Sequence, residues 1–146
     1  MRGFEIAKGY HKDKVRLPKR GTAKSAGYDL ETIETITIKP GEIIRAATGL
    51  KAYMQNDEVL KLYPRSSMAE KGLTIPNNVG IIDADYYGNP TNDGAIFVQL
   101  YNFSKAPITI TKGMRIAQGI FQKYLKATDE TPPEKARAGG FGSTGL

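Results

Sequence analysis

The stretch from Ile81 to Gly88 (IIDADYYG) places two carboxylates, Asp83 and Asp85, two residues apart. In an extended chain both would point to the same side, roughly 6–7 Å apart along it. They follow an apolar run and would therefore lie where a buried strand emerges. The pattern is compatible with a polar strand end that leads into a turn, and also with a general base that holds and deprotonates a water molecule.

A second polar group, Pro64-Arg65-Ser66-Ser67, opens the segment Ser66 to Lys71, which is predicted to form one or two helical turns. Free amides at a helix start, two hydroxyls and a guanidinium can together bind an anion. The same residues also suit an ordinary helix start, in which Ser67 and Glu70 are spaced as a capping box and Arg65 lies at the surface.

Two shorter motifs carry further charged groups. Ala26 to Leu30 (AGYDL) is predicted to be a tight turn that presents Asp29. In Arg115 to Gln118 (RIAQ), strand alternation would turn Arg115 to one side and Gln118 to the other. A buried Arg115 would need a carboxylate partner, and Asp85 is a candidate.

The elements that must position these groups have a β-like pattern. Short alternating runs such as Ile96, Val98 and Leu100 are separated by turns rich in Gly, Pro, Asn and Asp. Two of the runs, ITIKPGE from residue 36 and ITITKGM from residue 108, echo each other as two hairpin arms, with Pro40-Gly41 suited to a type II turn. Many short strands of this kind predict an all-β barrel or sandwich with one short helix.

The last part of the chain has a different composition. Residues 126–146 contain Pro132-Pro133 and four glycines, and they show no apolar period. Such a segment cannot bury a face, so we expect a domain over residues 1–125 and a flexible glycine-rich arm over residues 126–146. The run GGFGSTG in the arm is either a linker or a segment whose amides and hydroxyls wrap phosphates.

Composition limits the chemistry that remains. The chain has 146 residues, which predicts one domain, and it contains no cysteine and a single histidine, His11. Thiol nucleophiles, zinc fingers and a serine triad with a downstream histidine are therefore excluded. No apolar stretch is long enough for a membrane helix, and the N-terminus lacks the apolar core of a signal peptide, so a cytoplasmic protein without membrane association is expected.

The net charge of +6 is confined to one end of the chain. Residues 1–24 hold eight Lys or Arg against two acidic residues, whereas residues 25–146 hold thirteen of each sign. A basic stripe across the fold would indicate a nucleic-acid-binding face, and the neutral body argues against one. No nucleic-acid partner is expected.

Five motifs, taken in order, resemble those of the homotrimeric dUTPase family. They are AGYDL, PRSSMAEKG, GIIDADYYG, RIAQ and GGFGSTG, and they span residues 26–145. The resemblance implies a distorted jelly-roll β-barrel that assembles as a homotrimer. It also implies Mg²⁺-dependent hydrolysis of dUTP to dUMP and pyrophosphate, which keeps uracil out of DNA and supplies dUMP for dTMP synthesis. Active sites would be shared between subunits, with the arm completing a neighbouring site.

The resemblance also implies roles for residues around the nucleoside. Asp83 would be the general base that activates water for attack on the α-phosphate. Tyr86 would lie against the deoxyribose and leave no room for a 2′-hydroxyl. Asn77, with backbone groups of the hairpin that ends at Gly80, would recognise the uracil edge, while Arg115 and Asp85 would be structural.

Other residues are implied to contact the phosphates, the metal or the closed arm. Asp29 would contact waters on the Mg²⁺, and Phe141 would close over the uracil. The residues implied to bind phosphate on the barrel are Arg65, Ser66, Ser67 and Gln118. Those implied to do so from the arm are Arg137, Gly142, Ser143 and Thr144.

The chain departs from the family pattern, and two related functions stay open at this point. Pro90 to Gly94 is an insertion after Asn89, and Arg137 is one residue closer to the glycines than in the usual tail. A dCTP deaminase resembles this fold and shares the Arg-Ser-Ser run, but it lacks the Ile-Asp-x-Asp-Tyr pattern. A dUTPase-like regulatory module that binds a partner protein is the other alternative.

Overall fold

The computed structural model describes residues 1–142, 144 and 145. The regular secondary structure of this part of the chain consists of twelve strands and two short 3₁₀ turns. None of its helices is long and apolar enough to cross a membrane. The elements are β1 (Gly3–Ile6), β2 (Lys19–Arg20), β3 (Tyr28–Glu31), β4 (Ile36–Ile38), β5 (Ile43–Ala47), β6 (Leu50–Tyr53), β7 (Glu58–Tyr63), η1 (Ala69–Lys71), β8 (Leu73–Thr74), β9 (Gly80–Asp83), η2 (Ala84–Tyr86), β10 (Phe97–Asn102), β11 (Ile108–Ile110) and β12 (Arg115–Lys123).

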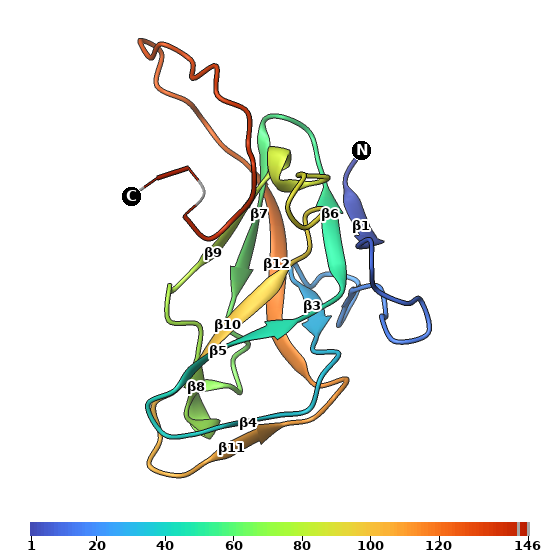
Figure 1. Ribbon diagram of the computed structural model, residues 1–146, viewed down its shortest axis with the longest axis vertical. Coiled ribbons are helices and arrows are strands. Elements are labelled where there is room, and N and C mark those ends of the chain that lie inside the picture. The colour runs from blue at the N-terminus through green and yellow to red at the C-terminus, as the bar shows by residue number, and fades with distance from the viewer. Residues whose placement is uncertain (143, 146) are drawn as a thin grey trace.

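The strands form a distorted jelly-roll barrel (Figure 1). The largest sheet has the order β2-β3-β12-β7-β9, a second has the order β5-β10-β8, and β1-β6 and β11-β4 form two further pairs. The pairing between these strands is antiparallel. The long strand β12 lies at the centre of the largest sheet, so it connects the part of the chain near Asp29 with β7 and β9.

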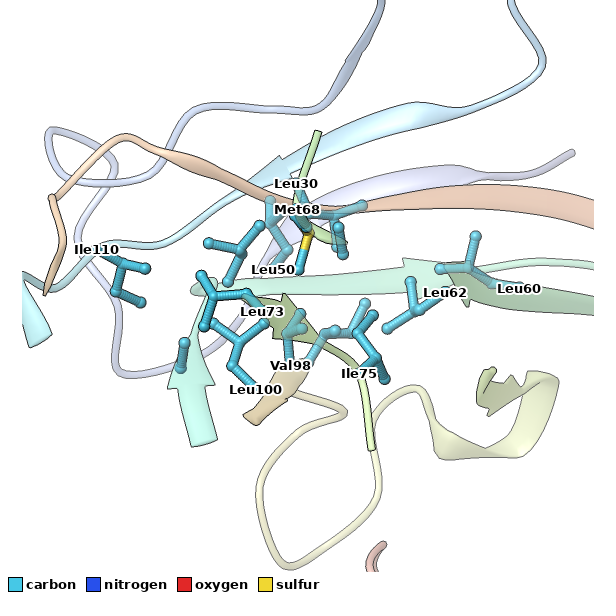
Figure 2. Packing of buried hydrophobic residues seen from close by; sticks show 14 of the residues in the cluster. Leu30, Leu50, Leu60, Leu62, Met68, Leu73, Ile75, Val98, Leu100 and Ile110 are labelled. Atoms are coloured by element: carbon cyan, nitrogen blue, oxygen red, sulfur yellow. The ribbon is translucent and has the colours of Figure 1, made fainter. Parts of the chain in front are cut away.

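One hydrophobic core lies between the sheets (Figure 2). Leu30 of β3, Leu60 of β7 and Leu100 of β10 are all fully buried in it. The predicted common face of Ile96, Val98 and Leu100 is confirmed, since all three side chains are buried. This core fixes the ends of β3, β7 and β9, from which the candidate site residues project.

The two echoing segments pair with each other. Strand β4 lies antiparallel to β11, and the hydroxyls of Thr37 and Thr109 are 2.9 Å apart across the pair. Each segment continues into a turn with glycine at positive φ, 76° at Gly41 and 86° at Gly113. The predicted Pro-Gly turn is closed by a bond from the amide of Glu42 to the carbonyl of Lys39. The similar sequences of the two segments therefore correspond to two paired strands, each of which leads into a glycine turn.

The predicted helix from Ser66 is shorter than expected, and its predicted capping box is wrong. The structure has only the 3₁₀ turn η1, and Met68, not Ser67, occupies the position before it. Met68 is buried, and its amide donates to the carbonyl of Arg65. Burial of the methionine side chain thus fixes this turn, which ends at Gly72 with φ 85°.

The AGYDL segment is also not the predicted turn throughout. Tyr28 to Glu31 forms β3, which pairs with β2 on one side and β12 on the other. Because strands on both sides saturate its backbone, Asp29 projects from a strand and not from a loop.

Candidate functional site

Four of the predicted nucleoside-binding and catalytic residues line one cavity, here called the Asp83 pocket. It has a volume of about 310 Å³. Asn77 lies in the loop between β8 and β9, Gly80 begins β9, Asp83 ends it, and Tyr86 belongs to η2. The predicted hairpin that ends at Gly80 is wrong, because β8 pairs with β10 whereas β9 pairs with β7 in another sheet. The remaining lining residues are Leu62, Val79, Ile81, Ile82, Phe97, Arg137, Gly140 and Phe141. Most of the lining side chains are apolar, and Asp83 supplies the carboxylate.

The loop between β8 and β9, residues 75–79, forms one side of the Asp83 pocket and is held by hydrogen bonds within its own backbone. Asn78 has φ 64°, and the amide of Val79 donates to the carbonyl of Asn77 at 2.7 Å. Gly80 lies opposite Leu62 on β7, where a side-chain Cβ would come within 3.0 Å of the leucine Cβ. Glycine at this position therefore lets β9 approach β7 closely while its backbone groups stay on the pocket wall.

The two aspartates of the DADYY motif converge on Arg137 of the arm. The guanidinium donates to Asp83 through Nη2 and to Asp85 through Nε, each at 2.7 Å. Asp85 lies in η2, so the 3₁₀ turn, and not an extended strand, brings the two carboxylates together. The hydrogen bond to Asp85, with the nearby charge of both carboxylates, raises the pKa of Arg137 above its ordinary value.

Tyr86 forms a buried wall of the same pocket. Its hydroxyl donates to the carbonyl of Ala95 at 2.7 Å. A Cβ on Gly140 would come within 2.7 Å of the Tyr86 ring, so the arm passes directly against the ring at this glycine. The ring is thus fixed on one edge and covered by the arm on another.

In the single chain, Arg137, Gly140 and Phe141 of the arm line the Asp83 pocket of the same chain. The end of the arm turns back toward β9 (Figure 1). The Phe141 ring is half exposed and lies beneath the guanidinium of Arg45, with 3.9 Å between the guanidinium carbon and the ring centroid. Thr91 of the insertion donates its hydroxyl to the carbonyl of Ala138. Gly142 and Thr144 are exposed, and Ser143 lies outside the described residues.

Most of the predicted phosphate- and metal-contacting residues of the barrel line a different cavity, here called the Ser66 pocket. It has a volume of about 370 Å³. Its lining residues are Gly21, Ser25, Ala26, Gly27, Asp29, Arg65, Ser66, Arg115, Gln118 and Ile120. Ser67 is exposed beside Ser66 and does not appear in the described lining of either pocket.

Asp29 lies between two arginines in the Ser66 pocket. Arg65 donates from Nε to Oδ1 at 2.9 Å, and Arg115 lies 3.5 Å from Oδ2. The predicted Arg115–Asp85 pair is therefore wrong. A β-bulge between Arg115 and Ala117 breaks the strand alternation, so Arg115 is half exposed and reaches Asp29 on the neighbouring strand.

Gln118 lies beside Asp29 in this pocket, as its paired residue on the neighbouring strand β12. Its amide nitrogen donates to the carbonyl of Pro64 at 3.1 Å, and a Cβ on Gly27 would come within 2.5 Å of its Oε1. Glycine at position 27 therefore provides the space that the Gln118 side chain occupies.

The Asp83 pocket and the Ser66 pocket share no lining residue among those described. One contains the candidate base with the β8–β9 loop and the tyrosine, and the other contains an aspartate, two arginines, two serines and a glutamine. Sequence analysis did not identify the contacts that Thr91 and Arg45 make with the arm. The sequence marks Thr91 only as part of the insertion at residues 90–94, which by itself predicts no contact with the arm.

Comparisons with known proteins agree on one family. The dUTPase family model matches residues 13–145. The chain is 50% identical over 147 residues to a deoxyuridine 5'-triphosphate nucleotidohydrolase from Lactococcus lactis, covering 99% of this chain and 98% of the relative. It is 43% identical to the corresponding protein of Rickettsia bellii over 138 residues, covering 90% of this chain and 88% of that protein.

Solved structures give the same result. The fold is similar to the crystal structure of a dUTPase from Streptococcus mutans, with a TM-score of 0.81 and 46% identity over 86% of this chain and 98% of that chain. A dUTPase from phage phi11 of S. aureus shares the fold at 20% identity, with a TM-score of 0.75 over 92% of this chain and 97% of that chain. The chain therefore belongs to the dUTPase family, whose members are deoxyuridine 5'-triphosphate nucleotidohydrolases that hydrolyse dUTP to dUMP and pyrophosphate.

Proposed function

We propose that Asp83 is the general base of dUTP hydrolysis in this chain. The observation that carries this proposal is its place at the rim of a pocket that also holds Asn77, Gly80 and Tyr86. Its carboxylate is half exposed, so it lies in a position open to water, and it accepts a hydrogen bond from Arg137, which it shares with Asp85. A water oriented by this carboxylate attacks the α-phosphorus in line with the leaving pyrophosphate, and the carboxylate accepts its proton.

The Asp83 pocket suits a pyrimidine deoxynucleoside. The backbone groups of the loop around Asn77 recognise the uracil edge by hydrogen bonds, and they reject cytosine through its mismatched donor and acceptor pattern. The same loop leaves no room for the methyl group of thymine. The buried ring of Tyr86 packs against the deoxyribose, where a 2′-hydroxyl would clash and lose its water.

The Ser66 pocket suits the triphosphate. Arg65 supplies charge, while Ser66 and Gln118 supply neutral donors. Asp29, oriented by two arginines, retains free lone pairs and would accept hydrogen bonds from waters on a Mg²⁺ ion bound with the phosphates. When bound, the ion neutralises phosphate charge.

We infer a homotrimer in which the two pockets of different subunits form one site. The separation of Asp83 and Ser66 into pockets without common residues supports this inference, because one dUTP must contact both sets. The arm of residues 126–146 would complete such a site. Arg137 then exchanges its contacts with Asp83 and Asp85 for phosphate oxygens, and Phe141 covers the uracil.

Pyrophosphate release from dUTP, dCTP, dTTP and UTP, each with and without Mg²⁺, tests the proposed specificity and metal dependence. We expect rapid release from dUTP with Mg²⁺ and little from the other three nucleotides. Equal rates with dUTP and UTP would contradict the proposed role of Tyr86. Full activity after removal of Mg²⁺ by a chelator would contradict the proposed metal.

A further inference from the structure

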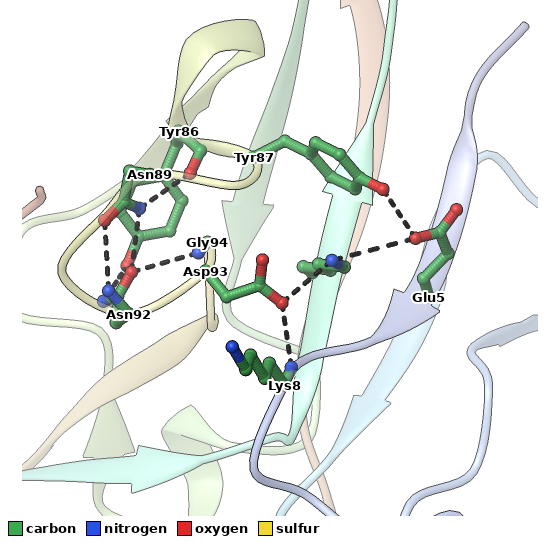
Figure 3. A network of polar contacts seen from close by, with 9 residues as sticks. Glu5, Lys8, Tyr86, Tyr87, Asn89, Asn92, Asp93 and Gly94 are labelled. Atoms are coloured by element: carbon green, nitrogen blue, oxygen red, sulfur yellow. Dashed lines mark hydrogen bonds and ion pairs between the residues drawn. The ribbon is translucent and has the colours of Figure 1, made fainter. Parts of the chain in front are cut away.

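The insertion after the DADYY motif forms a hydrogen-bonded loop, residues 89–94, directly behind Tyr86 (Figure 3). The side-chain amide of Asn89 donates to the backbone carbonyl of Tyr86 at 2.7 Å and to Oδ1 of Asn92 at 2.8 Å. The side-chain amide of Asn92 donates to the hydroxyl of Tyr86, also at 2.8 Å. The loop therefore holds Tyr86 at both its backbone and its ring end.

These bonds use both hydrogen-bonding functions of the Tyr86 hydroxyl. The oxygen accepts from Asn92 and donates its proton to the carbonyl of Ala95 at 2.7 Å. Because the residue is buried, any movement of the whole side chain that displaces the hydroxyl would leave polar atoms without partners and out of contact with water. The place of the hydroxyl end of the ring thus depends in part on the Asn92 side chain.

The loop itself is fixed to the barrel by Asp93. Its Oδ2 accepts from the amide of Lys8 and from the ammonium of Lys51 on β6, each at 2.8 Å (Figure 3). Asp93 and Gly94 adopt positive φ angles of 61° and 89°. Anchored at this point, the loop forms a rigid support for Asn92.

We propose that Asn92 is a positioning residue for sugar discrimination, because it holds the Tyr86 side chain at the place where its ring excludes a 2′-hydroxyl. The inference rests on the proposed placement of Tyr86 against the deoxyribose. Asn92 lines another hollow, together with Tyr10 and Pro90, and it is absent from the described lining of the Asp83 pocket, with which that hollow shares only Phe97. It acts through Tyr86 and not by contact with the substrate.

The test compares kcat and KM for dUTP and UTP in five forms: the parent protein, Asn92→Ala, Tyr86→Phe, the double variant and Asn56→Ala. Asn56 is an exposed asparagine in the turn between β6 and β7 and serves as the matched control. Asn92→Ala removes the hydrogen bond to the Tyr86 hydroxyl together with two bonds inside the loop, those from Asn89 and from the amide of Gly94 to Oδ1. For the bond to Tyr86 we expect the dUTP/UTP ratio of kcat/KM to fall roughly fivefold, which corresponds to about 1 kcal/mol. The change should appear mainly in KM, since Asp83 is untouched.

The Tyr86→Phe background separates positioning from a general effect on the loop. Without the tyrosine hydroxyl, Asn92→Ala should cause no further fall in the ratio. An equal fall in both backgrounds would mean that the alanine acts by disordering the loop, and an unchanged ratio in the single variant would mean that Asn92 does not position the ring. Either result overturns the proposal.

Tyr86→Ala distinguishes failure of this inference from failure of the proposed function. If Tyr86→Ala lowers the dUTP/UTP ratio while Asn92→Ala leaves it unchanged, the sugar contact stands and the positioning role is wrong. If Tyr86→Ala leaves the ratio unchanged, both the sugar contact and the role of Asn92 are wrong.

Discussion

Replacing Asp83 with asparagine should abolish turnover without unfolding the protein. The amide keeps the shape of the side chain and can still hold a water molecule, but it cannot accept the proton. Loss of a general base lowers the rate roughly 10²- to 10⁴-fold, or about 2.7–5.4 kcal/mol in the activation free energy. We therefore expect kcat for dUTP to fall by this factor while the dissociation constant for dUTP changes little.

The structure sets a much smaller limit on the effect of the same substitution on stability. The Asp83 side chain is 49% exposed, so solvent screens its ion pair with Arg137. Exposed pairs contribute about 0–1 kcal/mol. For a chain of this size, such a loss lowers Tm by only about 2–4 °C. A large fall in turnover with a small change in Tm would thus locate the defect in the chemical step.

Asp85→Asn is the matched control, because Asp85 binds the same guanidinium but lies more exposed, at 60%. We expect this variant to retain most of its turnover. The assay is Mg²⁺-dependent pyrophosphate release, accompanied by calorimetric binding of a non-hydrolysable dUTP analogue and by thermal unfolding. Near-normal turnover in Asp83→Asn would refute the assignment, and loss of turnover in Asp85→Asn alone would transfer the role of base to Asp85.

Three further predictions concern assembly, the arm and pH. An Asp83→Asn chain and a chain truncated after Lys135, each with little activity alone, should regain partial pyrophosphate release when co-assembled; no recovery, or a monomer by light scattering, would contradict shared sites. The arm from residue 136 onward should be protected from protease by the dUTP analogue and not by dUMP. Ordering the arm costs about 1–2 kcal/mol per residue, and only contacts to both the uracil and the γ-phosphate offset this cost. Equal protection by both ligands would mean that the arm is not a lid. The hydrogen bond from Lys51 holds the pKa of Asp93 below its ordinary value of 3.8, so Asp93→Asn should lower the free energy of unfolding at pH 7. The difference in this free energy between variant and parent should vanish as the pH falls below 3.8 and through the lowered pKa of the folded protein. A difference that is constant across this range would contradict the Asp93 anchor.

Sequence patterns predicted those parts of the fold that depend on neighbouring residues. The turn at Pro40-Gly41 and the apolar face of β10 follow from local backbone preference and strand alternation, and both are confirmed. The helix at Ser66 illustrates the limit of this approach, because burial of Met68 by distant strands decided the local conformation. Tertiary packing overrode a capping signal that was sound in isolation.

The ion-pair partners of charged residues could not be predicted from the pattern of neighbouring residues. Strand alternation predicts sides only while each residue stays in register, and the bulge after Arg115 breaks that condition, so the arginine meets Asp29 instead of Asp85. Arg137 presents the same problem over a longer distance, since its two carboxylate partners lie 52 and 54 residues earlier in the chain. The glycines around it indicate only a segment with little intrinsic order. The observed position of Arg137 depends on the 3₁₀ turn η2, which brings the carboxylates of Asp83 and Asp85 together. The spacing of these two aspartates alone predicts an extended strand there and not a turn.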